Sequence, residues 1–286
     1  MSRRSLMRTL LGMFAVVSAL HGAPRYAAGA ELAASQPWSV NFVPYAWLPW
    51  LDGDATVKGR TVSVKVDPIQ VLEHLERAPF MGYLEAGKGP IFLYGDVVYA
   101  NLGLNADGIR FRQVAPGIGA TLTAALGLDF EQTIMEVGGG YEVMKVNQIA
   151  FDVLAGARYW RQDLGVNLAL GLDITGLNIS RGIAIARSGD VDWLDPLVGG
   201  RIRMNVARGE VLLLRADVGG FGVGSEISWN ALAAYSFDIA AMDGVTYSGI
   251  LGYRALYVDY EQGSGRTKYE YDVLQHGPVT GLSVRF

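Results

Sequence analysis

The feature that most constrains this chain is a two-residue alternation of apolar and polar side chains in its C-terminal half. Residues 212–219, 227–238 and 245–257 each carry apolar residues on one parity and mostly Gly, Ser, Asn, Asp or Arg on the other. Successive side chains of a β-strand point to opposite faces, so such runs predict strands with one apolar and one polar face. Short polar turns at 207–209 and 241–244 separate them. The pattern therefore predicts an antiparallel sheet built from hairpins.

The same alternation extends through most of the chain and predicts about twelve strands, with ten as the alternative count. Gly-rich and polar segments, such as the one near residues 145–147, separate the runs. The remaining strands, besides one that ends at the C-terminus, are expected near 38–47, 54–66, 80–87, 91–102, 109–123, 133–143, 151–159 and 194–206.

One short segment interrupts the strand pattern and has the signature of a helix start. Asp67 is a favourable N-cap, Pro68 suits the first helical position, and Gln70 lies three residues after the cap. We expect a short helix on the periplasmic side of the sheet structure. It is either a connector packed over one end or a partial plug.

The first thirty residues have the pattern of a secretory signal peptide. Arg3, Arg4 and Arg8 precede an apolar stretch at 9–20, and the small residues at 28–30 form a cleavage pattern. The sequence thus predicts a signal peptide at 1–30 and one domain at 31–286. Removing the four Arg of the signal from 24 bases leaves 20 against 28 acids. An acidic mature chain disfavours nucleic-acid binding, and the absence of Cys excludes disulfides and thiolate metal sites.

A transmembrane barrel explains the composition better than a soluble β-sandwich. Half of the residues are hydrophobic, yet no apolar stretch of about 18 residues follows position 25. The polar faces of the strands hold Gly, Ser and charges rather than the second apolar set that a sandwich buries. The apolar faces carry aromatic rings that suit a bilayer interface, namely Trp229, Tyr235, Phe237, Tyr247 and Tyr257. The predicted fold class is all-β, an antiparallel transmembrane β-barrel, in which an even strand count leaves both chain ends on the periplasmic side.

The last strand ends on Phe286, with Leu282 and Val284 on the same face. This ending resembles the C-terminal strand of bacterial outer-membrane proteins, in which a terminal aromatic is read by the barrel-assembly machinery. Most of the chain is similar to poorly characterised, porin-like outer-membrane β-barrel proteins of proteobacteria, through residues 45–49, 217–225, 252–254 and 276–278. The resemblance implies an outer-membrane location in a Gram-negative envelope, with membrane lipids and the assembly machinery as partners. It supplies no substrate.

Few residues suggest catalysis. A hydrolase needs a nucleophile, a base and an orienting group within hydrogen-bond reach. His276 could lie near Asp272 and Ser283, but Ser283 has the opposite strand parity and lies seven residues away. His74 belongs to the expected helix, next to acidic residues. The glycine-rich segment 220–224 precedes a strand rather than a helix, which favours a tight extracellular hairpin over a phosphate loop. We therefore expect no enzyme, no metal and no cofactor.

The inward-facing charges are the strongest candidates for function. Acids concentrate on the earlier strands and Arg on the later ones, so that a closed sheet would bring two arcs opposite each other. In a narrow barrel these charges would pair into a salt-bridged plug. In a water-filled lumen they would select small polar solutes. The preferred function is a small passive channel for hydrophilic solutes, the alternative a closed structural or adhesive barrel, and the least favoured an envelope lipid or peptide hydrolase. The inward set is Glu85, Asp96, Glu136, Asp152, Arg158, Arg201, Arg203, Arg215, Asp217 and Arg254.

Overall fold

The structure is a computed structural model that describes residues 37–57, 59–115, 118–175 and 179–286. Within these ranges, the side chains of 60, 62, 104–129, 164 and 166–188 are not described. The signal peptide expected at 1–30 lies outside the described residues. The described residues belong to one compact unit, Pro37–Phe286.

The described unit is a closed antiparallel barrel, which confirms the predicted all-β barrel fold. Ten strands pair in ring order, and pairing of the first with the last closes the ring. The alternating faces and short turns of the sequence lead directly to this arrangement. The ten strands of the ring are β1 (Ser39–Trp47), β4 (Phe80–Lys88), β5 (Ile91–Ala115), β6 (Ile118–Val146), β7 (Ile149–Thr175), β8 (Ile179–Ala207), β9 (Glu210–Gly219), β10 (Ile227–Met242), β11 (Val245–Gln262) and β12 (Tyr269–Arg285).

The two ends of the barrel differ in their connections. At one end, which we call the turn end, tight turns join β4–β5, β6–β7, β8–β9 and β10–β11. The turn between β10 and β11 places Asp243 and Gly244 at φ of 51° and 81°, the left-handed pair that two-residue hairpins require. β1 begins and β12 ends at the same end. At the opposite end, the loop end, the connections β9–β10 and β11–β12 are longer.

Two predicted strands are wrong in detail. Residues 54–66 do not form one strand but belong to a hairpin of β2 (Trp50–Val57) and β3 (Arg60–Val66). This hairpin turns at Gly59, whose φ of 74° favours glycine. It pairs with β12 through β2, and its two strands are not among the ten that close the ring. Residues 109–123 do not form one strand, because β5 ends at Ala115 and β6 begins at Ile118. The described residues contain twelve strands, the expected number, but ten of them form the barrel.

The predicted helix is present as α3 (Pro68–Glu73), with the expected cap. The Asp67 carboxylate accepts from the backbone N–H groups of Ile69 and Gln70, both at 2.9 Å. The sequence placed this helix at the same end as the chain termini. The chain instead leaves β1 at the loop end and enters β4 there, so that α3 lies at the end opposite the start of β1 and the end of β12. The described residues also contain one 3-10 turn, η3 (Gly265–Thr267), and none of their helices is long and apolar enough to cross a membrane.

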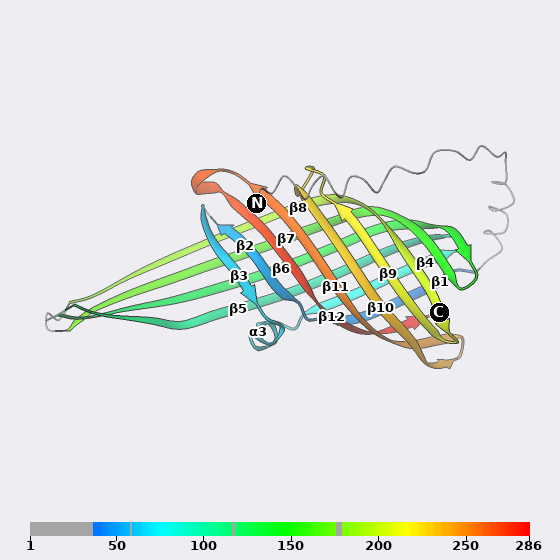
Figure 1. Ribbon diagram of the computed structural model, residues 1–286, viewed down its shortest axis with the longest axis horizontal. Helices are drawn as coiled ribbons and strands as arrows, with labels where there is room; N and C mark the ends of the chain where they lie inside the picture. Colours follow the sequence, from blue (N-terminus) through cyan, green and yellow to red (C-terminus); the bar gives the residue numbers. More distant parts are fainter. Residues whose placement is uncertain (1–36, 58, 116–117, 176–178) are drawn as a thin grey trace, which may run out of the picture. The chain divides into compact units, whose positions relative to one another are not determined.

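Strands β5 to β8 are much longer than the rest of the ring. They have 25 to 29 residues, whereas a tilted strand needs about 9–11 residues to cross a bilayer. Pairing of β4 with β5 ends at Tyr99, and pairing of β8 with β9 begins at Leu197. Beyond these residues the four strands pair with one another, apart from an isolated bridge between Leu102 of β5 and Leu75, and they run past the loop end (Figure 1).

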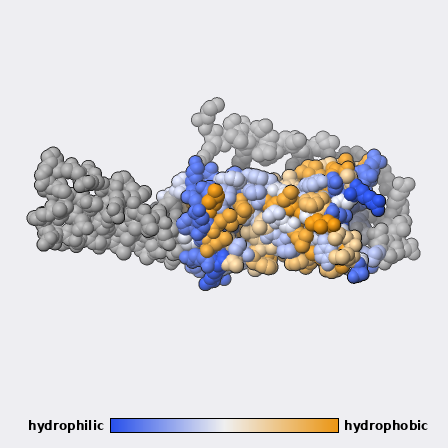
Figure 2. All heavy atoms as spheres, turned by 90° about the horizontal axis from the view of Figure 1, so that it is seen from below, coloured by the Kyte–Doolittle hydropathy of each residue, from blue (hydrophilic) through white to orange (hydrophobic). Residues whose placement is uncertain are grey.

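The outer wall of the barrel is apolar, whereas the interior has two different halves. Val137 and Val198 are 67% and 56% exposed, and Figure 2 shows apolar residues over the wall with hydrophilic residues gathered towards both ends of it. The interior of the turn-end half is charged, as the sequence predicts. The interior of the loop-end half is an apolar core, which corrects the expectation that no second apolar set exists. This core includes Trp47, Trp160, Trp193, Leu256, Val258, Tyr260, Tyr271 and Val273, together with Leu51, Ala55 and Val57 from β2.

Candidate functional site

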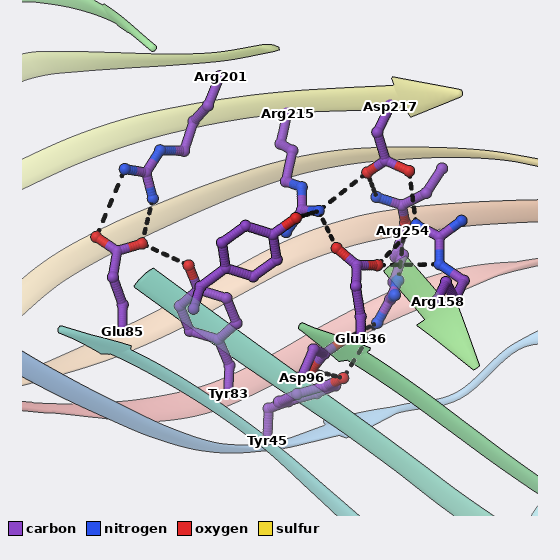
Figure 3. A network of polar contacts seen from close by, with 12 residues as sticks. Tyr45, Tyr83, Glu85, Asp96, Glu136, Arg158, Arg201, Arg215, Asp217 and Arg254 are labelled. Atoms are coloured by element: carbon purple, nitrogen blue, oxygen red, sulfur yellow. Dashed lines mark hydrogen bonds and ion pairs between the residues drawn. The ribbon is translucent and has the colours of Figure 1, made fainter. Parts of the chain in front are cut away.

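The structure brings all ten charged residues singled out in the sequence into ion pairs inside the turn-end half. We call this set, together with Glu142, the lumen network. It contains five Arg and six carboxylates, so its charges nearly balance. Figure 3 shows part of the network and the strands that carry it. The network consists of three groups, which follow one another from the turn end towards the apolar core.

The first group centres on Asp152 of β7. Its carboxylate accepts from Arg201 Nε at 2.7 Å and from Arg203 Nη2 at 2.8 Å, both on the neighbouring strand β8. Arg203 also donates to Glu142 at 2.8 Å. Arg201 reaches across the interior to Glu85 of β4. One buried carboxylate thus holds two guanidinium groups in place, and one of these links opposite walls of the barrel.

The second group joins two Arg with two carboxylates. Arg158 donates to Glu136 at 2.7 Å and to Asp217 at 2.6 Å. Arg215 binds the same two carboxylates, Glu136 by a short contact and Asp217 at 3.1 Å. The Arg158 side chain is fully buried. Each charge therefore has two partners of opposite sign, which offsets the large cost of removing it from water.

The third group lies nearest the apolar core. Arg254 of β11 donates to Asp96 of β5 at 2.9 Å, and the Tyr45 hydroxyl donates to the same carboxylate at 2.7 Å. Arg254 Nε also donates to Asn230, whose amide donates to Asp217 at 2.9 Å. Asn230 thus connects the second and third groups.

Aromatic rings and glycines shape the interior around the Arg side chains. Arg201, Arg215 and Arg254 lie over the rings of Phe92, Tyr94 and Trp47, at 4.1, 4.7 and 5.1 Å. Such cation–π contacts strengthen when water is excluded. A Cβ at Gly138 would lie 2.6 Å from the Tyr94 hydroxyl, so that glycine on this wall leaves room for the ring.

The sequence predicted the members of the network better than their arrangement. Glu85–Arg201 and Asp96–Arg254 do pair across the interior, as two opposed arcs require. Asp152, however, pairs with Arg on the adjacent strand, because neighbouring inward side chains are also within reach. Several partners were missed although their inward parity could have revealed them. These are Tyr45, Tyr83, Phe92, Tyr94, Glu142 and Asn230.

The apolar core lies on the loop-end side of the lumen network, and aromatic rings cross the interior there. Trp193 of β8 stacks on Trp160 of β7 at 5.5 Å and on Tyr260 of β11 at 3.9 Å between ring centroids. Because β11 is not adjacent to β8 in the ring, the second stack spans the interior. The indole nitrogens of Trp160 and Trp193 have no hydrogen-bond partner among the described residues.

The residues considered for hydrolysis do not assemble. His276 Nδ1 lies 2.6 Å from the Tyr253 hydroxyl, and its ring stacks on Trp50 at 5.7 Å. Ser283 instead donates to Asn41 at 2.6 Å, and Asp272 accepts from Tyr257. His74 ends α3, where its ring Nδ1 lies 2.9 Å from the Gln70 carbonyl oxygen.

Two other segments noted in the sequence have structural positions. Residues 220–224 lie in the connection between β9 and β10 at the loop end, with Gly220 at φ 88°. Ser225 anchors this loop by donating its backbone N–H and hydroxyl to Asp195 at 2.7 and 2.8 Å. Phe286 is exposed, and its backbone pairs with Val40 of β1 at the turn end.

Comparisons with known proteins find resemblance at the level of structure only. No family model and no curated protein matches the sequence. Solved structures with a similar arrangement include the outer membrane protease OmpT of Escherichia coli, at 7% identity and a TM-score of 0.47, covering 88% of this chain and 97% of that one. Another is the attachment invasion locus protein Ail of Yersinia pestis, at 11% identity and 0.29, covering 87% and 98%. The translocator domain of the autotransporter NalP of Neisseria meningitidis has 15% identity and 0.36, covering 92% and 94%. At these values the likeness indicates neither an activity nor a ligand.

Proposed function

We propose that this protein is an integral outer-membrane barrel with a closed interior, and that it serves as an anchor for the long strands β5 to β8. The observation that carries this proposal is the lumen network. Most of its charges are buried, and all of them are paired with one another rather than left free along a water-filled passage. The proposal includes no enzymatic role.

The outer wall supports the membrane placement. Large apolar side chains on alternate positions are exposed, among them Leu93, Val137, Val198 and Leu251, and their sequence neighbours point inward. Pairing of each ring strand with its two neighbours satisfies the backbone polar groups along most of the wall, as hydrocarbon requires. The stacked rings of Trp229 and Tyr257, at 6.0 Å, face outward on β10 and β11, where aromatic side chains favour a bilayer interface. The expected signal peptide agrees with an outer-membrane destination.

The filled interior favours a closed barrel over a passive channel. A solute crossing the barrel would have to separate Arg158 from its two carboxylates and then displace the stack of Trp193 on Tyr260. Breaking one buried ion pair alone costs about 3–5 kcal/mol. The lumen network therefore acts as a plug that binds the walls together.

An anchor also explains the unequal strand lengths. The ring supplies a rigid base in the bilayer, and β5 to β8 continue beyond the loop end as a four-stranded sheet. Outer-membrane lipids surround the base, and the barrel-assembly machinery inserts it, with Phe286 as the recognised terminal residue. The protruding sheet is then the part that contacts the surroundings of the cell.

Conductance measurement tests the closed interior. Purified full-length protein is refolded, its folded state is checked by the heat-dependent shift in gel mobility, and it is reconstituted in planar bilayers beside a general porin as a positive control. We expect folded protein with no steady conductance steps. Reproducible single-channel steps from heat-modifiable protein would contradict the proposal, and failure to insert would contradict the membrane placement.

A passive channel for hydrophilic solutes is the second candidate. One observation favours it: at the turn end, the side chains of Arg203 and Glu142 are 36% and 27% exposed, so water reaches the first group of the network. In this alternative the network would be a charged filter that opens by rearrangement. Steady conductance with a preference between cations and anions would support it.

A further inference from the structure

The barrel wall has a local gap at the loop end, between β1 and β4. These strands pair only as far as Pro44 and Gly82. Beyond this point the backbone N–H of Trp47 donates to the sulfur of Met81 at 3.1 Å, rather than to a carbonyl of the neighbouring strand. The chain then bends at Leu48 and Pro49, and β2 continues along β12.

An apolar cavity of about 180 Å³ occupies this gap. The helix α3 and the segment after it form one side, where Leu75 bridges to Leu102 of β5. Exposed lining residues mark the mouth, and buried ones mark the floor. The mouth includes Ala46 and Leu72. The floor includes Trp47, Val98, Gln132 and Gln275.

The floor offers one unused hydrogen-bond donor. Trp47 is 2% exposed, and its indole Nε1 has no partner among the described residues. By contrast, Gln132 and Gln275 are paired with each other, with Gln275 Nε2 donating to Gln132 at 3.1 Å. A buried donor without an acceptor is costly, and a ligand that supplies the acceptor removes this cost.

From this geometry we propose that the cavity binds a small neutral amphiphile, an apolar group of about six carbons that carries one hydroxyl or carbonyl acceptor. An engineered cavity of about 150 Å³ takes up benzene, which sets the size. Ala46 at the mouth has the same strand parity as the exposed Phe42 of the outer wall, so the ligand arrives from the bilayer and its oxygen accepts from Trp47 Nε1. The inference goes beyond the proposed anchor role. It requires a folded barrel, but it does not depend on whether the lumen conducts.

The six Trp of the chain allow a direct test. Full-length ¹⁵N-labelled protein in micelles gives one indole N–H signal for each Trp, and loss of a signal in Trp47→Phe assigns that of Trp47. Titration with 1-hexanol is compared with titration with hexane, which lacks the acceptor. We expect a saturable shift of the Trp47 signal with 1-hexanol and a much smaller one with hexane.

Two variants locate the site. Ala100→Phe fills the cavity, whereas Ala233→Phe places the same bulk on the outer wall of β10. The first should weaken binding by about tenfold, equivalent to about 1.4 kcal/mol, and the second should leave it unchanged. Equal, unsaturable shifts of all six indoles would mean general partitioning and would overturn the inference. Equal saturable responses to hexane and 1-hexanol would overturn the role of the Trp47 donor. A conductance result bears only on the closed lumen, so the two proposals fail separately.

Discussion

The two halves of the barrel interior are built from the same strands but hold different chemistry. On β11, the inward position Arg254 belongs to the lumen network, whereas Leu256, Val258 and Tyr260, at the next inward positions, belong to the apolar core. The change occurs within two residues along one strand. Strand parity therefore determines which residues point inward. Whether a charged or an apolar side chain fits there depends on the residues that face it across the interior.

The opposite walls explain the contrast. In the loop-end half, a Cβ on Gly189 of β8 would lie 3.5 Å from the side chains of Val57 and Tyr269, which belong to β2 and β12. The walls there approach each other as in a sandwich, and large apolar groups fill the space. In the turn-end half, Arg side chains extend across the interior to carboxylates on distant strands. One barrel thus combines a network of paired charges with an apolar core.

The largest effect is expected from removing two Arg of the lumen network together. In the double variant Arg215→Ala and Arg254→Ala, Asp96 loses the Arg that binds it, and Glu136 and Asp217 each lose one of two. Breaking a buried pair costs about 3–5 kcal/mol. The barrel should unfold at a markedly lower temperature, as followed by gel mobility after heating, without gaining conductance.

The matched control for this double variant is Arg208→Ala. Arg208 is exposed in the turn between β8 and β9, and its loss should leave the unfolding temperature unchanged. If the double variant instead raised conductance and shifted ion preference towards cations at unchanged stability, the lumen would be open. The proposed plug formed by the lumen network would then be wrong.

In the apolar half, we expect the free energy of unfolding to fall when a cavity is created rather than when a charge is removed. Trp193→Ala removes both the stack on Trp160 and the stack on Tyr260. A Trp→Ala change in a core lowers the free energy of unfolding by about 3–5 kcal/mol. Denaturant unfolding from vesicles, followed by fluorescence, measures this loss. Trp229→Ala on the outer wall is the control. It should lower the free energy of unfolding by less, because lipid replaces part of the lost contact. An equal loss in the two variants would indicate that the interior stack adds nothing to stability.

The sequence predicted the charged half of the interior well and missed the apolar half. The charged residues stand out because an Arg or Asp inside an apolar sheet has to face inward and find a partner. Trp160 and Trp193 have the same inward parity, but an apolar residue on either face is unremarkable in a membrane barrel. The core also depends on the β2–β3 hairpin, whose turn at Gly59 was not recognised within residues 54–66. The misplacement of α3 has the same origin. Counting one strand where the structure has two, β2 and β3, moves the helix that follows them to the opposite end of the barrel.

The boundary between the halves sharpens the comparison. Gln132 and Gln275 pair with each other there, and Gln275 also donates to the Tyr271 hydroxyl at 3.3 Å. Gln275→Leu leaves the Gln132 amide unpaired and should cost about 1–3 kcal/mol. The double change of both Gln to Leu should cost less than the single one, since both partners are replaced by apolar groups. A double-mutant cycle on the free energy of unfolding measures the coupling, and strict additivity would mean that the amides do not pair.

The smallest effect is expected where an ion pair lies at the surface of the turn end. Arg285 and Asp238 approach to 3.8 Å, with side chains 48% and 40% exposed. Asp238 also accepts from the Ser248 hydroxyl at 2.7 Å, so that its carboxylate stays hydrogen-bonded and hydrated when Arg285 is removed. Exposed pairs contribute about 0–1 kcal/mol, and salt screens them. Arg285→Ala should therefore change the free energy of unfolding by less than about 1 kcal/mol at low salt, and by nothing measurable at high salt.

The loss caused by the Arg215 and Arg254 double variant should persist at both salt concentrations, because buried pairs are screened much less. If high salt abolished that loss as well, water and ions would have access to the lumen network, and the closed interior would have to be abandoned.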